Sequence, residues 1–323
     1  MEHNLPLYRA NIIQSPSYAA CPGFIPALGW RTDKAGHVLV NKSSNENAVV
    51  SVIGRVLKLR LDCGPTGNFI KGRFGGLQTA KYHCLLEKPD KTPFANDFDN
   101  SLSNFERVQS DIASTANKNN FIVVDGQQKH LRFTKYVFEK RERALEGSYS
   151  ICVAAQLLRI SIFTDNGAVE NEVDDETENW PVPVELRGDL DNIKRTYRAN
   201  PLRVFARDAF VEARNVNDVI RGALVEMHFE LNHYCIRGKN QDSFNAHIQQ
   251  IQVLQPGKPR PLNAYKRKNV RDGPIRLCPA LNVATLNSSA SAPPGGAVRS
   301  EQNLNENAFA SGSGTNNRQE NCK

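Results

Sequence analysis

The feature that most constrains the fold is a stretch of strict alternation near residue 230. Apolar side chains occupy every second position of this stretch, at Val225, Met227, Phe229 and Leu231. The positions between them are polar, at Glu226, His228 and Glu230. Alternation of this kind predicts a β-strand with one buried face. We therefore expect the four apolar side chains to be buried and the three polar ones to be exposed.

A return strand is expected at residues 244–254, after a polar loop at 237–242. Its apolar positions change parity, because Phe244, Ala246 and Ile248 lie on one face, whereas Ile251 and Val253 lie on the other. A change of face within one strand requires an extra residue, so a β-bulge is predicted at residues 249–250. The two strands together form a predicted hairpin.

Period-two patterns rich in β-branched residues also run through the first half of the chain. Strands are expected at residues 49–61, 68–74, 80–87, 121–124, 131–138 and 149–163. The first of them changes its buried face near Gly54, and the last changes it between Leu157 and Leu158. Such slips predict bulged, coiled strands of the kind that small barrels need.

Two segments have helical spacing. Leu102, Phe105, Val108 and Ile112 recur on one face and predict a helix at residues 102–112. A second helix is predicted at 201–213, because proline suits a first helical turn and the apolar residues that follow fall on one side. The sequence thus predicts a β-rich α+β fold, either a coiled, bulged antiparallel sheet or a small OB-like barrel with one or two helices.

The composition predicts how the chain is divided. Residues 282–323 are rich in Asn, Ser, Gly and Ala, so we expect a disordered C-terminal tail after a folded domain at 1–281. Six acidic residues within 169–179 predict a solvated loop inside that domain. No apolar run approaches the roughly 18 residues of a membrane span, and the first residues lack the regions of a secretory signal. We expect an intracellular protein whose seven scattered cysteines are free thiols.

The familiar catalytic and metal-binding motifs are not found. His228, His233, Cys235 and His247 lie on the predicted hairpin, but they lack the close pairs of a zinc site, and His228 and His233 face opposite sides of a strand. The glycine-containing segments at 63–68 and 72–76 match no phosphate-binding loop, and no G-x-S-x-G motif is present. We expect no cofactor, no metal ion and no catalytic residue, although an enzyme of another kind stays open.

Basic and aromatic residues gather in two regions of a chain whose net charge is +7. In the first region the expected strands interleave the cations Arg55, Lys58, Arg60, Lys71 and Arg73 with the aromatic residues Phe69, Phe74 and Tyr82. In the second region Tyr265 is surrounded by the cations Lys258, Arg260, Lys266, Arg267, Lys268 and Arg271. Cations suit phosphates and exposed rings suit stacked bases. Core aromatics with charged neighbours would explain the first region equally well. A solvated linker or a nuclear import signal at 266–268 would explain the second.

The predicted hairpin also resembles a known family. A glycine at 222 opens the first strand, Tyr234 follows, and the second strand ends at 254. This arrangement over residues 219–254 resembles the closing hairpin of phage-type single-stranded DNA-binding proteins of the OB fold. The acidic C-terminal tail of that family is missing, because the chain ends in Glu320-Asn321-Cys322-Lys323. The chain as a whole resembles proteins of mushroom-forming fungi, which implies no function.

These observations favour binding of single-stranded DNA or RNA without catalysis. The cations would hold phosphates, and Phe69, Phe74, Tyr82 and Tyr265 would stack on bases. The protein would then be intracellular and, given residues 266–268, nuclear. The alternative is an interaction or assembly protein whose sheet edges pair with partners or copies. The sequence leaves the oligomeric state open.

Overall fold

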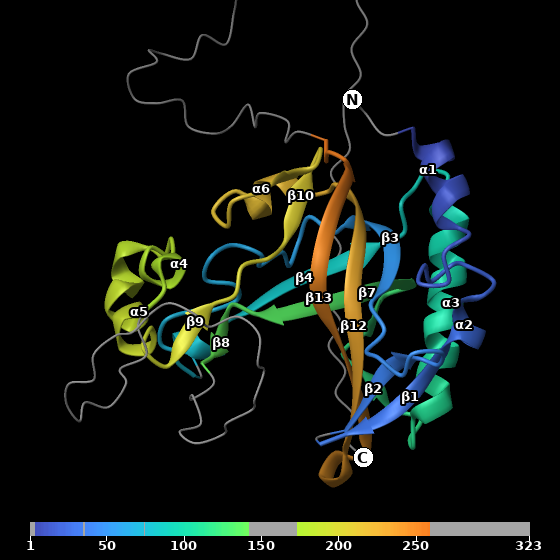
Figure 1. The fold of residues 1–323 in the computed structure, drawn as a ribbon, viewed down its shortest axis with the longest axis horizontal. Coiled ribbons are helices and arrows are strands. Elements are labelled where there is room, and N and C mark those ends of the chain that lie inside the picture. The colour runs from blue at the N-terminus through green and yellow to red at the C-terminus, as the bar shows by residue number, and fades with distance from the viewer. Residues whose placement is uncertain (1–3, 35, 74, 142–172, 259–323) are drawn as a thin grey trace, which may run out of the picture. The chain divides into compact units, whose positions relative to one another are not determined.

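Five strands close into a ring in a computed structural model of the chain (Figure 1). They are β3 (Val50–Val56), β4 (Lys81–Glu87), β7 (Gln128–Tyr136), β13 (Gln241–Gln255) and β12 (Leu224–Ile236). Each strand pairs with the next in this order, and β12 pairs back to β3. All of these pairings are antiparallel except that of β7 with β13. If these five strands are numbered by their order in the sequence, they follow one another around the ring as first, second, third, fifth and fourth.

The other elements extend the ring or lie beside it. The remaining strands are β1 (Leu28–Asp33), β2 (Gly36–Asn41), β5 (Lys118–Asn119), β6 (Ile122–Asp125), β8 (Phe138–Lys140), β9 (Tyr197–Ala199), β10 (Val204–Ala206) and β11 (Ala209–Phe210). The α-helices are α1 (Leu5–Ile12), α2 (Phe24–Ala27), α3 (Ala95–Ile112), α4 (Asp175–Glu178), α5 (Arg187–Ile193) and α6 (Val216–Ile220), with short 3-10 turns at Leu77–Thr79, Val184–Leu186 and Arg237–Lys239.

The structure describes residues 4–34, 36–73, 75–141 and 173–258, all within the unit Met1–Pro261. The expected strand at 149–163 and the expected tail at 282–323 lie outside these ranges. No helix in the described part of the chain is long and apolar enough to cross a membrane. Cys21, Cys63, Cys84 and Cys235, the cysteines within the described ranges, are free thiols as expected.

The core is a cluster of phenylalanine rings between α3 and the ring of strands. Phe229 of β12 lies 4.9 Å from Phe133 of β7, centroid to centroid, and 5.7 Å from Phe105 of α3. Phe121 contacts all three rings, and all four side chains are fully buried. Helix α3 contains the predicted helical face but begins earlier, at Ala95. It lies on one side of the sheet together with α1, whereas α4 and α5 lie on the opposite side (Figure 1).

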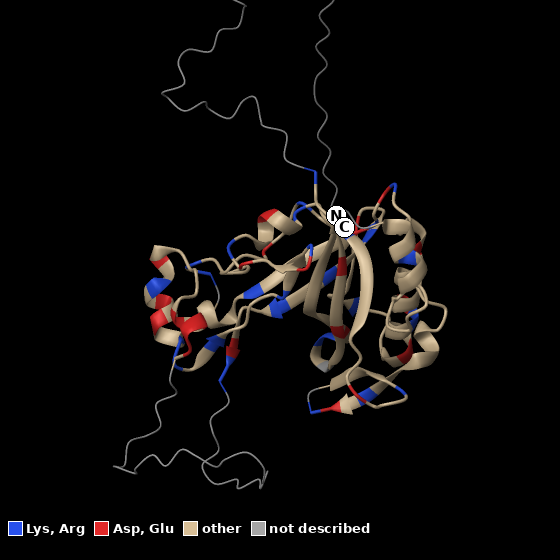
Figure 2. Cartoon of the chain, turned by 45° about the horizontal axis from the view of Figure 1, so that its top comes forward, with Lys and Arg blue, Asp and Glu red and all other residues tan. Residues whose placement is uncertain are grey.

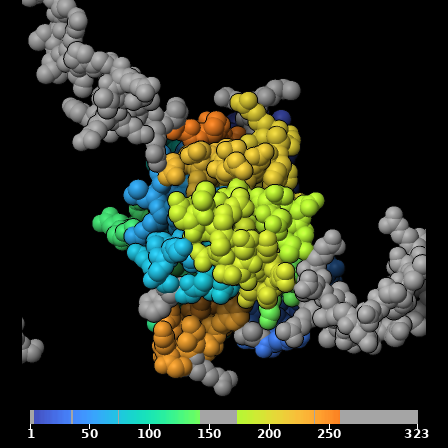
Figure 3. Space-filling model, turned by 90° about the vertical axis from the view of Figure 1, so that its left-hand side faces the viewer, coloured from blue at the N-terminus to red at the C-terminus, as the bar shows by residue number. Residues whose placement is uncertain are grey.

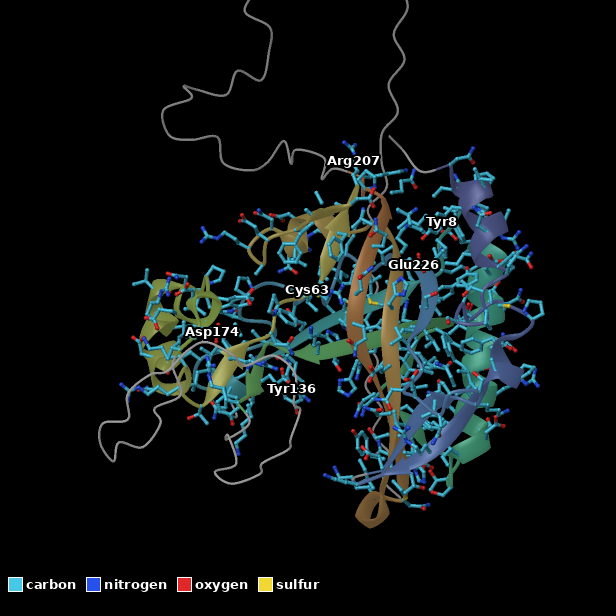
Figure 4. All side chains as sticks on the ribbon, in the orientation of Figure 1. Tyr8, Cys63, Tyr136, Asp174, Arg207 and Glu226 are labelled. Atoms are coloured by element: carbon cyan, nitrogen blue, oxygen red, sulfur yellow. The ribbon has the colours of Figure 1, made fainter. Side chains whose placement is uncertain are left out.

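The hairpin of β12 and β13 confirms the strongest sequence prediction. Its apolar positions on β12 are fully buried. His228 pairs with Gln250 and Phe229 with Ile248, so Gln249 is the extra residue of the predicted bulge. His228 and Glu230 are partly buried, and the expected exposure of Glu226 is wrong, because this side chain is only 5% exposed. Its carboxylate accepts a hydrogen bond from the Tyr8 hydroxyl of α1 and lies 3.1 Å from His228 Nε2 (Figure 4).

Two strand predictions in the first half of the chain are wrong. Strand β3 ends at Val56, pairs with β12 in continuous register and has no bulge at Gly54. This glycine instead allows α3 to pack closely, because a Cβ atom there would lie 3.0 Å from the Phe98 ring. The chain then turns, Arg60 adopts a positive φ of 58°, and Leu59 is 74% exposed. Residues 68–73 form turns rather than a strand.

The predicted helix at 201–213 and the predicted acidic loop also differ from the structure. Residues 204–210 form a β-hairpin, in which β10 runs parallel to β13 and β11 pairs back to β10. Leu202 and Val204 are buried alternately with more exposed neighbours, so the period is two rather than helical. The acidic segment, as far as it is described, contains α4, because the Asp174 side chain accepts a hydrogen bond from the Thr177 amide and caps the helix.

The turn between β10 and β11 offers a test of this correction. Arg207 and Asp208 both have positive φ angles, of 51° and 63°, as a two-residue type I′ turn requires. Arg207→Asn combined with Asp208→Gly should therefore raise the free energy of unfolding by about 1 kcal/mol, measured by urea denaturation. Asp208→Val should lower it, because a β-branched residue resists positive φ. If residues 201–213 formed a helix instead, the Arg207→Asn, Asp208→Gly variant would be less stable than the Asp208→Val variant.

Candidate nucleic-acid interface

A groove crosses the outer face of the ring, over β4, β7, β13 and β12. Its volume is about 1230 Å³, and an adjoining hollow of about 420 Å³ shares Lys81, Lys135, Tyr136 and His247 with it. One wall is the loop at residues 68–79, and the other is formed by the β8–β9 pair. Figure 3 views this side of the molecule, with the residues of α4 and α5 in front and the loop beside them. We call the two connected hollows the groove.

The strand register determines which side chains form the floor of the groove. His83 of β4 lies opposite Thr134 of β7, Thr134 lies beside His247 of β13, and His247 lies opposite Glu230 of β12. Side chains alternate along each strand, so the residues two positions away share this face. The other floor residues are Lys81, Arg132, Tyr136, Asn232, Tyr234, Asn245 and Gln249.

The loop that forms the first wall is fixed to the start of β4. The Asn68 amide donates to the Lys81 carbonyl, and the Lys81 amide donates to Asn68 Oδ1, each at 2.9 Å. Gly67 has a φ of 52°, and a Cβ atom there would lie 2.4 Å from the Lys81 carbonyl oxygen. Only glycine therefore permits this close approach. The loop fixed in this way contributes Phe69 and Arg73 to the lining of the groove, together with Lys81 of β4.

Three cations on the groove lack an acidic partner. Among the described residues, no carboxylate lies within 4.0 Å of Lys81, Arg132 or Lys135. The Nε of Arg132 is buried without a hydrogen-bond partner. Burial lowers the pKa of Arg132, and the nearby charge of Arg60 lowers it further. Figure 2 shows Lys and Arg on the strands beside the hairpin, whereas acidic residues gather on α4 and α5.

Lys135 is held in place by its surroundings. Its Nζ donates to the Pro201 carbonyl at 3.1 Å. Burial lowers its pKa; the charge of Arg203 adds to this effect, and that of Glu139 opposes it. Glu139 itself pairs with Arg198 at 2.9 Å. Glu139 and Glu230 also line the groove, but neither pairs with Lys81, Arg132 or Lys135, so these three cations stay available to an anion.

Tyr136 supplies an exposed aromatic ring beside these cations. The side chain is 44% exposed at the end of β7, on the side of the sheet that faces α4 and α5 (Figure 4). The Nζ of Lys81 lies 4.4 Å from the centroid of its ring. An exposed ring with a cation at its face can stack on a base while the cation contacts a phosphate.

Two histidines on the floor have pKa values below that of a free imidazole. Burial lowers the pKa of His83, and the charge of Arg132 lowers it further. Burial also lowers the pKa of His247, with a smaller contribution from Lys81. A neutral imidazole has one donor and one acceptor nitrogen. The centre of the floor can therefore form hydrogen bonds of both kinds, whereas the cations at its edges can only donate.

The structure brings some of the expected site residues to the groove and places others elsewhere. Phe69 and Arg73 line it. Lys71 points to α5, where it lies 3.7 Å from Asp189. Arg55 donates to the Gly222 carbonyl, and Lys58 lies beside the same glycine, so neither lines the groove. Arg60 lies near Arg132, and Lys258 is exposed after β13.

The structure does not support Tyr82 as a stacking residue. Its side chain is 1% exposed and belongs to the core, because β4 directs Tyr82, Cys84 and Leu86 inward. The remaining expected site residues lie outside the described ranges: Phe74, Arg260, Tyr265, Lys266, Arg267, Lys268 and Arg271. The candidate zinc ligands are not brought together either. His233 instead pairs with Asp242 at 2.7 Å and stacks on His37.

Three residues of the groove were not expected from the sequence. Arg132, Lys135 and Tyr136 lie in a strand that was predicted, at 131–138, but no function was assigned to its polar face. The polar face can be recognised in the sequence, because Leu131 and Phe133 alternate with Arg132 and Thr134, and Tyr136 follows on the same face as these two. A strand with a basic and aromatic outer face is typical of nucleic-acid-binding sheets.

The order of the strands around the ring identifies the type of fold. A five-stranded ring in the order first, second, third, fifth and fourth, with the third and fifth strands parallel, has the topology of an OB fold. In OB folds the ligand binds over the second and third strands and the loop between the first two. Here those elements are β4, β7 and residues 57–80, which carry much of the groove. The fold is therefore a β-rich α+β fold built around an OB-type ring.

Comparison with known proteins finds similarity in structure alone. No family model and no curated protein matches the chain. Among solved structures, the single-stranded DNA-binding protein gp2.5 of bacteriophage T7 is similar with a TM-score of 0.34 and 8% identity, over 71% of this chain and 98% of that one. The single-stranded DNA-binding protein of bacteriophage Enc34 is similar with a TM-score of 0.32 and 10% identity, over 76% and 97%.

The Enc34 protein in complex with single-stranded DNA is similar with a TM-score of 0.33 and 11% identity, over 72% and 98% of the two chains. Similarity at these scores assigns no family and no function. The resemblance to fungal proteins stays a prediction, because no curated protein matches.

Proposed function

We propose that the protein binds single-stranded nucleic acid in the groove, without catalysing a reaction. The observation that carries this proposal is the set of unneutralised cations beside the exposed ring of Tyr136, on the outer face of β4 and β7. Phosphates would lie along the cations and at least one base would stack on Tyr136. A duplex hides the faces of its bases, so a single strand is the better ligand.

The groove itself predicts how binding depends on salt. Five cations line it, namely Arg73, Lys81, Arg132, Lys135 and Lys140. Contact of all five with phosphates gives a slope of about −3.5 for log affinity against log salt, since each contact on a single strand contributes about −0.7. Titration of a fluorescent 20-mer at several salt concentrations measures this slope. A duplex of the same sequence should bind more weakly.

The ring of Tyr136 has its own test. Tyr136→Ala should weaken binding of the single strand by about 1 to 3 kcal/mol and leave the salt slope unchanged, because stacking involves no counterion. The matched control is Phe210→Ala, which removes an exposed ring of β11 outside the groove and should leave binding unchanged. Failure of the wild-type protein to bind at tens of micromolar would refute the proposal and favour the assembly alternative.

A further inference from the structure

The floor of the groove carries neutral amides as well as cations. Asn232 and Asn245 lie opposite each other on β12 and β13, and Gln249 is the residue that the bulge inserts. All three are partly buried and line the groove. Within the described part of the chain, no hydrogen bond is formed by any of these three side chains. They are therefore free to bind a ligand.

The chemistry of these groups indicates which part of a nucleotide they contact. A phosphate only accepts hydrogen bonds, so the cations at the edges of the floor suit it. An amide presents a donor and an acceptor side by side, and a phosphate can use only the donor. The edge of a base also presents donors and acceptors side by side. The amides therefore suit a base edge, and the floor differs from a purely electrostatic surface.

The combination of amides with Arg132 narrows the choice of base. Asn and Gln pair in bidentate fashion with N6 and N7 of adenine, and Arg pairs with O6 and N7 of guanine. Both pairings use N7, an acceptor that pyrimidines lack. We infer that the groove prefers purines: Asn245 and Gln249 bind N6 and N7 of adenine, and Arg132 binds O6 and N7 of guanine. This inference rests on the proposed function and adds a base preference to it.

The test compares three single strands of equal length: dA15, dT15 and dA15 in which every adenine is 7-deazaadenine. The modified base keeps its amino group and its stacking face but lacks the N7 acceptor. We expect dA15 to bind at least about fivefold more tightly than the other two, the smallest effect of one bidentate contact. The salt slopes of the three strands should agree, because their phosphates are the same.

A variant of the floor separates base recognition from phosphate binding. Asn245→Ala combined with Gln249→Ala should reduce the affinity for dA15 to that for 7-deaza-dA15, with the affinity for dT15 unchanged. The control variant combines Asn100→Ala and Gln127→Ala, two exposed amides outside the groove, and should keep the preference. Equal binding of the three strands by the wild type would overturn the purine preference alone. Failure of all three to bind would overturn the proposed function as well.

Discussion

Reversing the charges of Lys81 and Arg132 together should reduce the affinity for a single-stranded 20-mer by about a hundredfold or more. Each side chain lies on the floor of the groove without an acidic partner among the described residues. A hydrogen bond to a charged group contributes about 1.5–3 kcal/mol, so loss of two such contacts lowers the binding free energy by about 3 kcal/mol or more. That loss corresponds to a factor above one hundred in the dissociation constant.

The control is a second double reversal that changes the net charge by the same amount. Lys88 and Lys129 are exposed and pair with Asp99 and Glu106, each at 2.5 Å. Their reversal should weaken binding by less than tenfold, because neither residue lines the groove. Fluorescence anisotropy at one salt concentration measures both variants, and circular dichroism confirms that they fold. Equal losses in the two variants would mean that net charge alone governs binding.

Phe229→Ala should lower the free energy of unfolding by about 3–5 kcal/mol. The ring is fully buried and contacts the rings of Phe105, Phe121 and Phe133, so its removal leaves a cavity that rigid neighbours cannot fill. Urea denaturation followed by tryptophan fluorescence measures the change. Phe229→Leu keeps most of the side-chain volume and should lower the free energy of unfolding clearly less. This variant can still be measured if the alanine variant does not fold.

Phe210 provides the matched control for this prediction. Its ring is 53% exposed on β11 and contacts only the ring of Phe205 among the aromatic pairs of the described residues. Phe210→Ala should therefore change the free energy of unfolding by about 1 kcal/mol or less. A similar loss at both positions would show that the ring cluster between α3 and the strands is not the main source of stability.

The parts of the fold that could be predicted are those in which one sequence pattern has one structural solution. The alternation in β12 allows only a half-buried strand, and the slip at Gln249 requires a bulge, so both were predicted correctly. The apolar residues of α3 recur at helical spacing, which would not place them on one face of a strand. In each case the local pattern and the tertiary environment agree.

The errors arise where tertiary contacts override the local pattern. Leu57, Leu59 and Leu61 suggested that β3 continues with a change of face, but the strand ends at Val56, the chain turns at Arg60, and Leu59 is exposed. The apolar residues of 202–210 fit a helix until β13 offers a parallel partner and Arg207 and Asp208 turn the chain. Neither the early end of β3 nor the partner strand of β10 can be inferred from the segment itself.

The residues expected from the sequence coincide with the groove only in part. Phe69 and Arg73, which were expected as an aromatic and a basic site residue, line the groove. Tyr82 was also expected there but is buried, because it lies on the same face of its strand as the apolar residues Cys84 and Leu86. The role of Asn245 could not be predicted, because only the pairing of β7 with β13 places it beside Arg132.

The parallel pairing of β7 with β13 determines when during synthesis the protein can acquire its shape. Strand β7 ends at Tyr136, and β13 begins at Gln241, so the ribosome must make the whole intervening chain before the ring can close. Contacts so distant in sequence form slowly, and until then the edge of β7 stays open to other chains. A nascent chain without the last hairpin has the cations of β4 and β7 but none of the amides that face them. The complete floor therefore forms in one late step of folding.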